Sequence, residues 1–369
     1  MVNFNELIRH LGEKGEPFGL LSMQAVSTRE RLMAAFPDRM KCLFSAEHGY
    51  YGSAAPGEKT ASTWHPYWNM PIHSLYGTTR KPTDEMLEGL GRVVIDLQDI
   101  GVRCYTYMAT VKNMLEACAE RHLPVTVVDR AVPLGGIVDG PMRQPSYSSF
   151  VAPVNVPLCH GMTVGEYSTW IVQKEKLDLD LYVVKQYDWD HKSRMPWMNF
   201  VPPSPAIKSW DSAVMYPMTV FTEAFPAIDC DRQGSLAFRV IGAPWLDQKW
   251  LVAELQPGLA TCGVDIRPYR YQYSDGLLKG SNCNGLLFSV ARPEAFYPVT
   301  AGVLVLAALF NRHAKQILVG AKTDWYDKLM GTGEVLNAIR ADRLSELFQS
   351  WLEGRDEYLA SRVNFYPGE

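Results

Sequence analysis

Four short, almost continuous runs of apolar residues in the first third of the chain constrain its fold more than any other feature. They span residues 18–23, 41–44, 93–97 and 125–128. Runs of this length that are rich in Val, Ile, Leu and Phe are typical of strands buried on both faces. Helical patterns separate them. Strands that alternate with helices predict an α/β fold with a mostly parallel sheet, covered by helices on both sides.

The second half of the chain mixes the two kinds of element less regularly. Strands are expected at 236–241 and 285–290, and helices at 249–255, 299–312 and 345–360. This mixture indicates an α+β arrangement or a second, smaller α/β layer.

A proline-rich crossing, MPWMNFVPPSP at 195–205, is the best candidate for a boundary between these halves. The sequence therefore predicts two domains, at 1–200 and 201–369. A length of 369 residues also makes two domains the default expectation.

Composition excludes several classes of protein. The net charge of −4 and the absence of a basic block argue against a nucleic-acid partner. Seven dispersed cysteines without a CxxC pair indicate free thiols in a reducing compartment. The charged N-terminal segment does not resemble a signal peptide, and the apolar run 303–310 is too short to span a bilayer. We therefore expect a cytoplasmic protein, although a leader removed earlier would leave the same sequence. The sequence does not define an oligomeric state.

Polar groups follow three of the predicted strands at equivalent places. They are Glu47-His48, then residues 96–99 with Arg103, and then Asp129-Arg130. Because parallel strands end at one edge of a sheet, these groups are expected to converge in a cleft. Acids after strands also serve as helix caps and turn formers, so both interpretations stay open at this point.

Two segments match the capping box that begins many helices. Ser27 to Glu30 precedes the helical pattern that ends near residue 36, and Thr163 with Glu166 precedes another. Capping accounts for Glu166 without a catalytic role.

Several motifs are absent from the chain. No G-x-x-x-x-G-K-[ST], no G-x-G-x-x-G after the first strand and no G-x-S-x-G occur. Asp-x-Asp occurs at 178–180, 188–190 and 229–231, without a histidine at ligand spacing. We therefore expect neither a nucleotide cofactor nor a metal ion.

A series of blocks occurs in a fixed order along most of the chain. The densest part runs from residue 45 to residue 166, and the most specific blocks are EHGYYG (47–52), DLQDIGVRCYTYM (96–108) and HGMTVGE (160–166). Together they resemble the NamZ, or YbbC-like, exo-β-N-acetylmuramidases, a family of bacterial glycoside hydrolases. The resemblance implies a Rossmann-like N-terminal domain, a smaller C-terminal α/β domain and a pocket between them. It also implies release of N-acetylmuramic acid from the non-reducing end of peptidoglycan fragments, as in cell-wall recycling.

The chain differs from the family pattern in three loops. Residues 23–26 read Met-Gln-Ala-Val instead of Asn-Pro-Thr-Gly, and Ala131-Val132 replace the Asn of an Asn-Pro-x-Gly-Gly segment. The segment EAFPAIDCDRQGS (223–235) keeps only Glu223 and Gly234 clearly. These differences leave an alternative function, a sugar- or anion-binding protein of the same fold with altered specificity or no turnover. A further alternative is an unrelated α/β enzyme, which the missing phosphate-binding motifs disfavour.

Three residues are the candidates for catalysis. Cleavage of a glycoside needs an acid that protonates the leaving oxygen and a group that meets the oxocarbenium-like centre. Glu47 is expected to be the acid, and Asp99 and Glu58 are the next carboxylates. Tyr105 can orient the acetamido group of an N-acetyl sugar, whose own oxygen can act as nucleophile.

Seven further residues are expected to bind the substrate. Arg103 or Arg130 can bind the lactyl carboxylate of muramic acid through a guanidinium fork, and structural ion pairs with Asp96, Asp99 or Asp129 are the alternative for both. Tyr107, like Tyr105, can orient the acetamido group or stack on a sugar ring, and packing in the core is the alternative for one of the two. The remaining candidates are polar side chains in the family blocks: His48, Glu58, His160 and Glu223.

Overall fold

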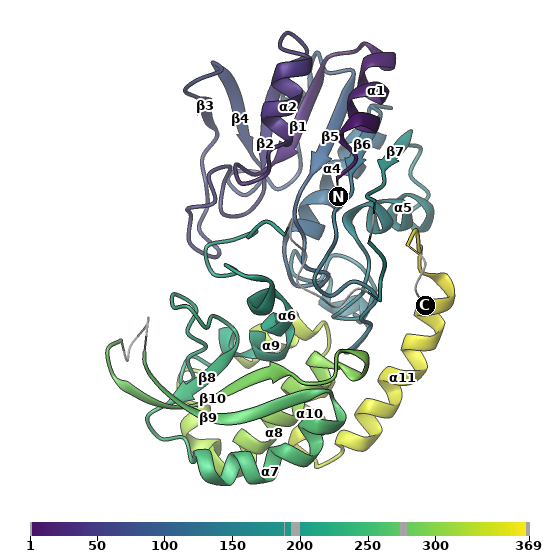
Figure 1. Ribbon diagram of the computed structural model, residues 1–369. Coiled ribbons are helices and arrows are strands. Elements are labelled where there is room, and N and C mark those ends of the chain that lie inside the picture. The colour runs from purple at the N-terminus through teal and green to yellow at the C-terminus, as the bar shows by residue number, and fades with distance from the viewer. Residues whose placement is uncertain (1, 188, 193–199, 274–275, 277–278, 367–369) are drawn as a thin grey trace.

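The computed structural model describes residues 2–187, 189–192, 200–273, 276 and 279–366, and its strands form two separate sheets (Figure 1). Within these residues, the larger sheet has seven strands in the order β3-β4-β2-β1-β5-β6-β7. Every neighbouring pair is parallel except the antiparallel pair β3 and β4. The predicted α/β class with a mostly parallel sheet is confirmed. The strands are β1 (Phe18–Ser22), β2 (Met40–Ser45), β3 (Thr63–His65), β4 (Met70–Ser74), β5 (Arg92–Asp96), β6 (Val125–Val128) and β7 (Leu181–Val184).

Both faces of this sheet pack against helices. Because successive side chains of each strand point to opposite faces, both sets of side chains are buried. In β1, Leu20 packs in one core cluster with residues of α1 and α2, while Leu21 packs in another with residues of α4 and α5. This two-sided burial explains why the strands are continuous apolar runs. The helices of this part are α1 (Phe4–Lys14), α2 (Thr28–Ala35), α3 (Asp84–Leu87), α4 (Tyr107–Ala119) and α5 (Val164–Lys174).

The two predicted capping boxes have different outcomes. At the start of α5, the Thr163 side chain accepts from the Glu166 N–H, and the Glu166 carboxylate accepts from the Thr163 N–H. That prediction is confirmed. At the start of α2, Ser27 makes no capping hydrogen bond, and its backbone (φ −82°, ψ 1°) is not extended as in a typical N-cap. The prediction for Ser27 is therefore wrong.

The smaller sheet lies in the second half of the chain and is antiparallel, with the order β8-β10-β9. A strand was expected at 236–241, but β8 begins only at Val240 because Phe238 adopts a left-handed backbone (φ 63°) that interrupts an extended strand. The helix α8 is mostly buried and packs between α6 and α7. The elements are β8 (Val240–Ala243), β9 (Val264–Gln272), β10 (Asn282–Val290), α6 (Trp210–Thr219), α7 (Gln248–Thr261), α8 (Pro298–Ile317), α9 (Thr323–Met330), α10 (Glu334–Arg340) and α11 (Leu344–Ser361), with the short 3₁₀ helices η1 (Pro145–Tyr147), η2 (Val220–Glu223) and η3 (Pro293–Ala295).

The proposed domain boundary near residue 200 stays a prediction. Residues 195–199 of the proline-rich crossing lie outside the described residues, and residues 200–205 are an irregular segment. One anchor of this segment is visible, because the buried Tyr107 hydroxyl donates to the Pro203 carbonyl oxygen at 2.5 Å.

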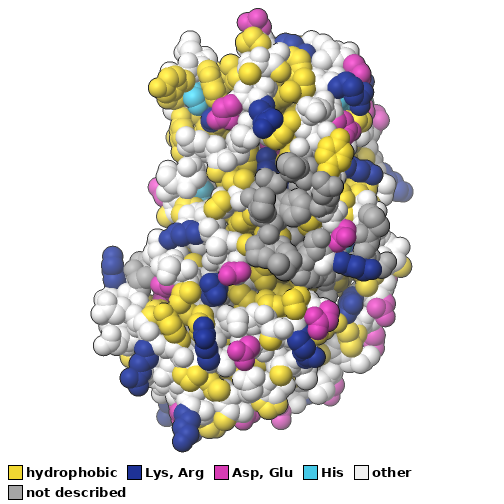
Figure 2. All heavy atoms as spheres, viewed as in Figure 1, with side chains coloured by type: hydrophobic (Ala, Val, Ile, Leu, Met, Phe, Trp, Pro, Cys, Tyr) yellow, Lys and Arg dark blue, Asp and Glu magenta, His cyan; other side chains and the backbone are white. Residues whose placement is uncertain are grey.

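Among the described residues, no helix combines the length and the apolar character needed to cross a bilayer. Figure 2 shows basic and acidic side chains interspersed over one face of the molecule, without a large block of one sign.

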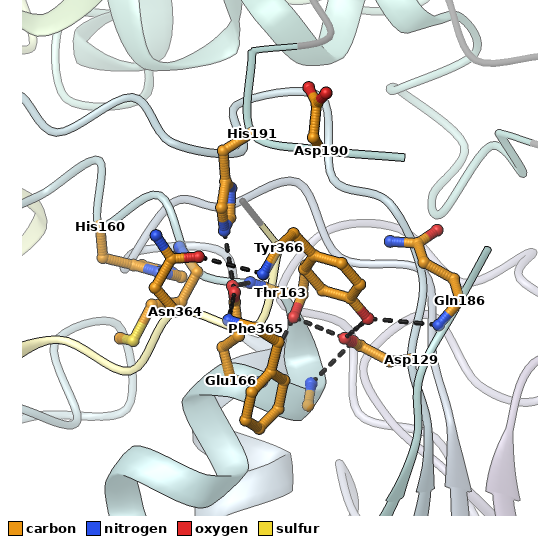
Figure 3. A network of polar contacts seen from close by, with 12 residues as sticks. Asp129, His160, Thr163, Glu166, Gln186, Asp190, His191, Asn364, Phe365 and Tyr366 are labelled. Atoms are coloured by element: carbon orange, nitrogen blue, oxygen red, sulfur yellow. Dashed lines mark hydrogen bonds and ion pairs between the residues drawn. The ribbon is translucent and has the colours of Figure 1, made fainter. Parts of the chain in front are cut away.

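The C-terminal segment returns to the larger sheet after α11, which runs along the right side of Figure 1 from the smaller sheet toward α5. There its residues meet two buried carboxylates (Figure 3). The Phe365 N–H donates to Glu166 at 2.7 Å, and the Tyr366 hydroxyl donates to Asp129 at 2.6 Å. Glu166 also contacts the ring of His191 at 2.8 Å. Asp129 and Glu166 thus bind a distant segment of the chain as well as the start of α5.

We predict that Tyr366→Phe lowers the free energy of unfolding by about 1–3 kcal/mol at pH 7.5. The change removes a hydroxyl donor to a buried carboxylate and keeps the ring that packs on Trp189, and such charge-assisted bonds have about this net value. Chemical denaturation followed by circular dichroism measures the loss. Tyr67→Phe, at an exposed site, is the matched control and should leave the midpoint unchanged. Equal midpoints for Tyr366→Phe and wild type would contradict the assigned role of the hydroxyl.

Candidate active site

A pocket of about 250 Å³, called here the inner pocket, is lined by residues from both halves of the chain. Four of the residues expected from the sequence line it, and the remaining six do not. Six lining residues matter for the chemistry: Glu47, His48, Tyr105, Ser204, Glu223 and Arg232.

Glu47 lies two residues after the end of β2, and two hydrogen bonds fix its carboxylate. One oxygen accepts from the Gly57 N–H at 2.7 Å, and the other contacts the hydroxyl of Thr106, the residue before α4. The side chain is nearly buried but lines the pocket. A carboxyl group held from two elements presents a defined orientation to a bound substrate.

The turn that follows Glu47 depends on left-handed backbone at two successive residues. His48 has φ 70° and Gly49 has φ 72°. A non-glycine residue in this region is strained by about 1 kcal/mol or more, so its neighbours must hold it in place. The His48 ring does this by a 2.8 Å hydrogen bond between Nδ1 and the Ala54 carbonyl oxygen. His48 therefore shapes the loop that carries Glu47.

Glu223 and Arg232 are charged residues that the second half of the chain contributes to the pocket. The Arg232 guanidinium lies 3.5 Å from the Glu223 carboxylate. Burial raises the pKa of Glu223, Arg232 counteracts this, and the charge of Glu47 raises the pKa further. Glu47 and Glu223 both line the inner pocket, so their carboxyl groups belong to the same site.

Tyr105 lines the pocket from the N-terminal half. Its ring packs edge-on against Tyr107 and Tyr216, at centroid distances of 4.9 and 6.1 Å. Burial raises the pKa of Tyr105 well above its ordinary value, so its hydroxyl stays protonated at neutral pH. Tyr107 is not a lining residue, and its hydroxyl bond to Pro203 supports a structural role.

Asp99 is fully buried and outside the inner pocket. One carboxylate oxygen accepts from the Gly101 N–H at 2.7 Å, and the other has no hydrogen-bond partner among the described residues. Burial raises the pKa of Asp99 to about 7.

The two arginines expected to bind a substrate anion are engaged elsewhere. Arg103 is fully buried and donates to the carbonyl oxygens of Val156 and Met330, and to that of Pro141 at 3.0 Å. Arg130 forms a two-point ion pair with Asp96, with one contact at 3.0 Å. The structural ion pair, left open as an alternative for Arg130, is what the geometry supports.

The last two expected residues also lie outside the pocket. His160 is fully buried, its Nδ1 accepts from the Met162 N–H at 3.2 Å, and burial lowers its pKa to about 3. Glu58 is exposed and accepts from the Ala55 N–H at 2.7 Å, which stabilises the turn that presents Gly57 to Glu47. Both contacts support local structural roles.

Sequence reasoning missed several residues of the pocket. Arg232 lies in the segment 223–235, which differs from the family pattern. Thr106 lies inside the block 96–108, between the candidate residues Tyr105 and Tyr107. Ser204 lies in the proline-rich crossing. No spacing rule connects these residues with Glu47, because folding alone brings them together.

No group of three or more His, Cys, Asp or Glu side chains with an arrangement suited to a metal ion is found in the part of the chain that the structure describes.

Comparisons with known proteins agree on one family. The profile described as "Exo-beta-N-acetylmuramidase NamZ, N-terminal" matches residues 19–211, and the corresponding C-terminal profile matches residues 214–366. The chain is 33% identical over 338 residues to "Peptidoglycan beta-N-acetylmuramidase NamZ" of Bacillus subtilis (strain 168), covering 88% of this chain and 80% of that protein.

Two crystal structures of DUF1343 family proteins from Bacteroides fragilis have the same fold. One superposes with a TM-score of 0.86 at 24% identity and covers 98% of both chains. The other has a TM-score of 0.76 at 21% identity and covers 96% of this chain and 95% of its own. At these identities the likeness concerns the fold alone.

We predict that Asp99→Asn removes a pH-dependent decrease in the free energy of unfolding and that the variant still turns over substrate. The pKa of Asp99 is about 7 in the folded state and ordinary in the unfolded state, so the unfolded state releases its proton first. Wild-type stability should therefore fall relative to the variant as pH rises from about 4 to about 7, by on the order of a few kcal/mol.

Denaturant titrations at pH 4, 5.5, 7 and 8 measure this difference, with the exposed Asp265→Asn as control. If the difference in free energy of unfolding between wild type and Asp99→Asn is constant across this pH range, the pKa of the buried Asp99 carboxyl group is not raised. A tenfold or larger loss of turnover in folded Asp99→Asn would indicate that Asp99 takes part in catalysis.

Proposed function

This chain belongs to the NamZ family of exo-β-N-acetylmuramidases, and we propose that it is a glycoside hydrolase that releases N-acetylmuramic acid from the non-reducing end of peptidoglycan fragments. The observation that carries the proposal is the inner pocket, in which Glu47 and Glu223 face one site together with the cation Arg232. Two carboxyl groups are the usual requirement for glycoside hydrolysis, and a cation suits the lactyl carboxylate of muramic acid.

Glu47 acts as the general acid in this proposal. A general acid must approach the glycosidic oxygen, on the side from which the leaving sugar departs. Glu47 is on the loop at the end of β2, and its orientation is set by Gly57 and Thr106. Thr106 can accept as well as donate, so its contact suits the protonated form of Glu47 and the ionised form that remains after proton transfer.

Glu223 supplies the negative charge. The Arg232 guanidinium favours the ionised form of Glu223 and counteracts the rise in pKa that burial causes. An ionised carboxylate in this place stabilises the oxocarbenium-like centre or orients the acetamido group that attacks it. Tyr105, which stays protonated, is a hydroxyl donor to the same acetamido group.

Arg232 is the proposed ligand for the lactyl carboxylate. It is the arginine that lines the inner pocket, whereas Arg103 and Arg130 are committed to backbone carbonyls and to Asp96. A substrate anion would share the guanidinium with Glu223, which an arginine fork with five N–H donors permits.

We predict that Glu47→Gln slows hydrolysis of a muramic-acid-containing disaccharide by about 10²–10⁴-fold, since general acid catalysis contributes about this much. An aryl glycoside of N-acetylmuramic acid needs little protonation of its leaving group, so the same variant should slow it far less. Glu223→Gln should slow both substrates to a similar extent, because the charge that it loses meets the sugar ring in both reactions.

Steady-state kinetics of both variants on both substrates, with binding of free N-acetylmuramic acid as the test of an intact pocket, separates the roles. The opposite pattern, in which Glu223→Gln spares the aryl glycoside, would exchange the roles of the two glutamates. Sugar binding without release by wild type would reject the hydrolase and favour a binding protein.

We predict that Arg232→Gln lowers the preference for N-acetylmuramic over N-acetylglucosamine substrates by about 10- to 100-fold. Loss of a charge-assisted pair with the lactyl group costs a few kcal/mol at most. The ratio of the two kcat/KM values is the measurement, and any effect through Glu223 cancels in it. Arg239→Gln, which removes a cation outside the pocket, is the matched control. An unchanged ratio in Arg232→Gln would place the anion contact elsewhere.

A further inference from the structure

A second, smaller pocket of about 190 Å³, called here the outer pocket, adjoins the inner pocket. It is lined by residues 23–25, 50–52 and 202–205, and Ser204 lines both pockets. The loop after β2 also contributes to both, because Glu47 and His48 line the inner pocket and Tyr50 to Gly52 line the outer one. The proposed acid therefore lies on the loop that connects the two spaces.

The walls of the outer pocket are held in place by hydrogen bonds. The Gln24 N–H donates to the Tyr50 carbonyl oxygen at 2.8 Å, which joins the loop after β1 to the loop after β2. The Tyr50 hydroxyl contacts the Arg29 guanidinium. On the opposite side, the Pro203 carbonyl oxygen accepts from Tyr107 at 2.5 Å. A site with fixed walls loses little entropy when a ligand enters.

The chemistry of the outer pocket differs from that of the inner one. None of its lining residues carries a charge, whereas the inner pocket contains Arg232 and two glutamates. The ring of Tyr51 is 44% exposed, and it packs against Tyr50 and His65 at centroid distances of 5.2 and 6.4 Å. The exposed side chain of Gln24 adds an amide that can donate and accept. An aromatic ring with a few neutral polar groups suits an uncharged sugar.

We infer that the outer pocket is the leaving-group subsite, which holds the neutral N-acetylglucosamine-type sugar from which the terminal muramic acid is cut. Tyr51 is its stacking platform and therefore a specificity-determining residue. The inference rests on the proposed function. A general acid protonates the oxygen that joins the terminal muramic acid to the leaving sugar, so it lies between the sites of these two sugars. The lack of charge distinguishes this occupant from a second muramic acid or a peptide carboxylate, both of which are anions.

The test compares Tyr51→Ala with two other variants. Tyr51→Trp keeps a stacking ring, and Tyr67→Ala removes a 91% exposed tyrosine outside both pockets. We expect Tyr51→Ala to lower kcat/KM on the muramic-acid–N-acetylglucosamine disaccharide by about 3- to 30-fold, as loss of one aromatic contact predicts. Tyr51→Trp should stay within about threefold of wild type, and Tyr67→Ala should equal it.

Two binding measurements complete the test without turnover. Titration with free N-acetylmuramic acid reports on the inner pocket and should be the same in all variants. Titration with N-acetylglucosamine reports on the outer pocket and should weaken only in Tyr51→Ala. If Tyr51→Ala matches Tyr67→Ala in both binding and turnover, the subsite is not at Tyr51. If wild type releases no muramic acid, the proposed function fails, and N-acetylglucosamine binding that depends on Tyr51 still decides whether the outer pocket takes a neutral sugar.

Discussion

The buried guanidinium of Arg103 is an interaction that joins the two halves of the chain directly. Its donors reach carbonyl oxygens at Pro141 and Val156 and, from the second half, at Met330. Burial lowers the pKa of Arg103 to about 10, so it remains charged at neutral pH, with carbonyl dipoles around it. A Cβ atom at Gly331 would lie 2.6 Å from this guanidinium, which explains a glycine there. Because the inner pocket draws Glu47 from one half and Glu223 from the other, its geometry depends on this junction.

The carboxylates at the carboxyl edge of the larger sheet fall into two groups, those bound to structural partners or closed off from the inner pocket and the one that lines it. Asp96 pairs with Arg130, Asp129 binds the start of α5 and Tyr366, and Asp99 is closed off from the pocket. Glu47 alone among the acids that follow these strands lines the inner pocket. Its place in the sheet accounts for this, since β2 lies on the β3–β4 side of β1, away from β6 and β7. One sheet edge thus carries both a buried charge network and a solvent-accessible acid.

The fold was predictable from the sequence because strands buried on both faces produce continuous apolar runs, as at 125–128, where the expected and observed limits of β6 agree. The hairpin of β3 and β4 was missed, since its edge strand is short and exposes Trp64. Glu47 was found because it follows a strand. Arg232 could not be found, because no local pattern relates it to a residue almost 200 positions earlier.

The three loops that differ from the family pattern lie in different environments. Residues 23–25 line the outer pocket, Ala131 is buried, and Arg232 lines the inner pocket.

The attachment of residues 365 and 366 to the larger sheet has a consequence for the order of folding. The partners of these contacts are 199 and 237 positions apart in the sequence. During synthesis, the N-terminal strands and α5 can pair well before residues 365 and 366 exist, so Asp129 and Glu166 at first have only their partners at the start of α5 and His191. Contacts of such long sequence separation form late, because loop closure must precede them. The first half of the chain is therefore expected to reach a compact but incompletely stabilised state, which the final segment then locks.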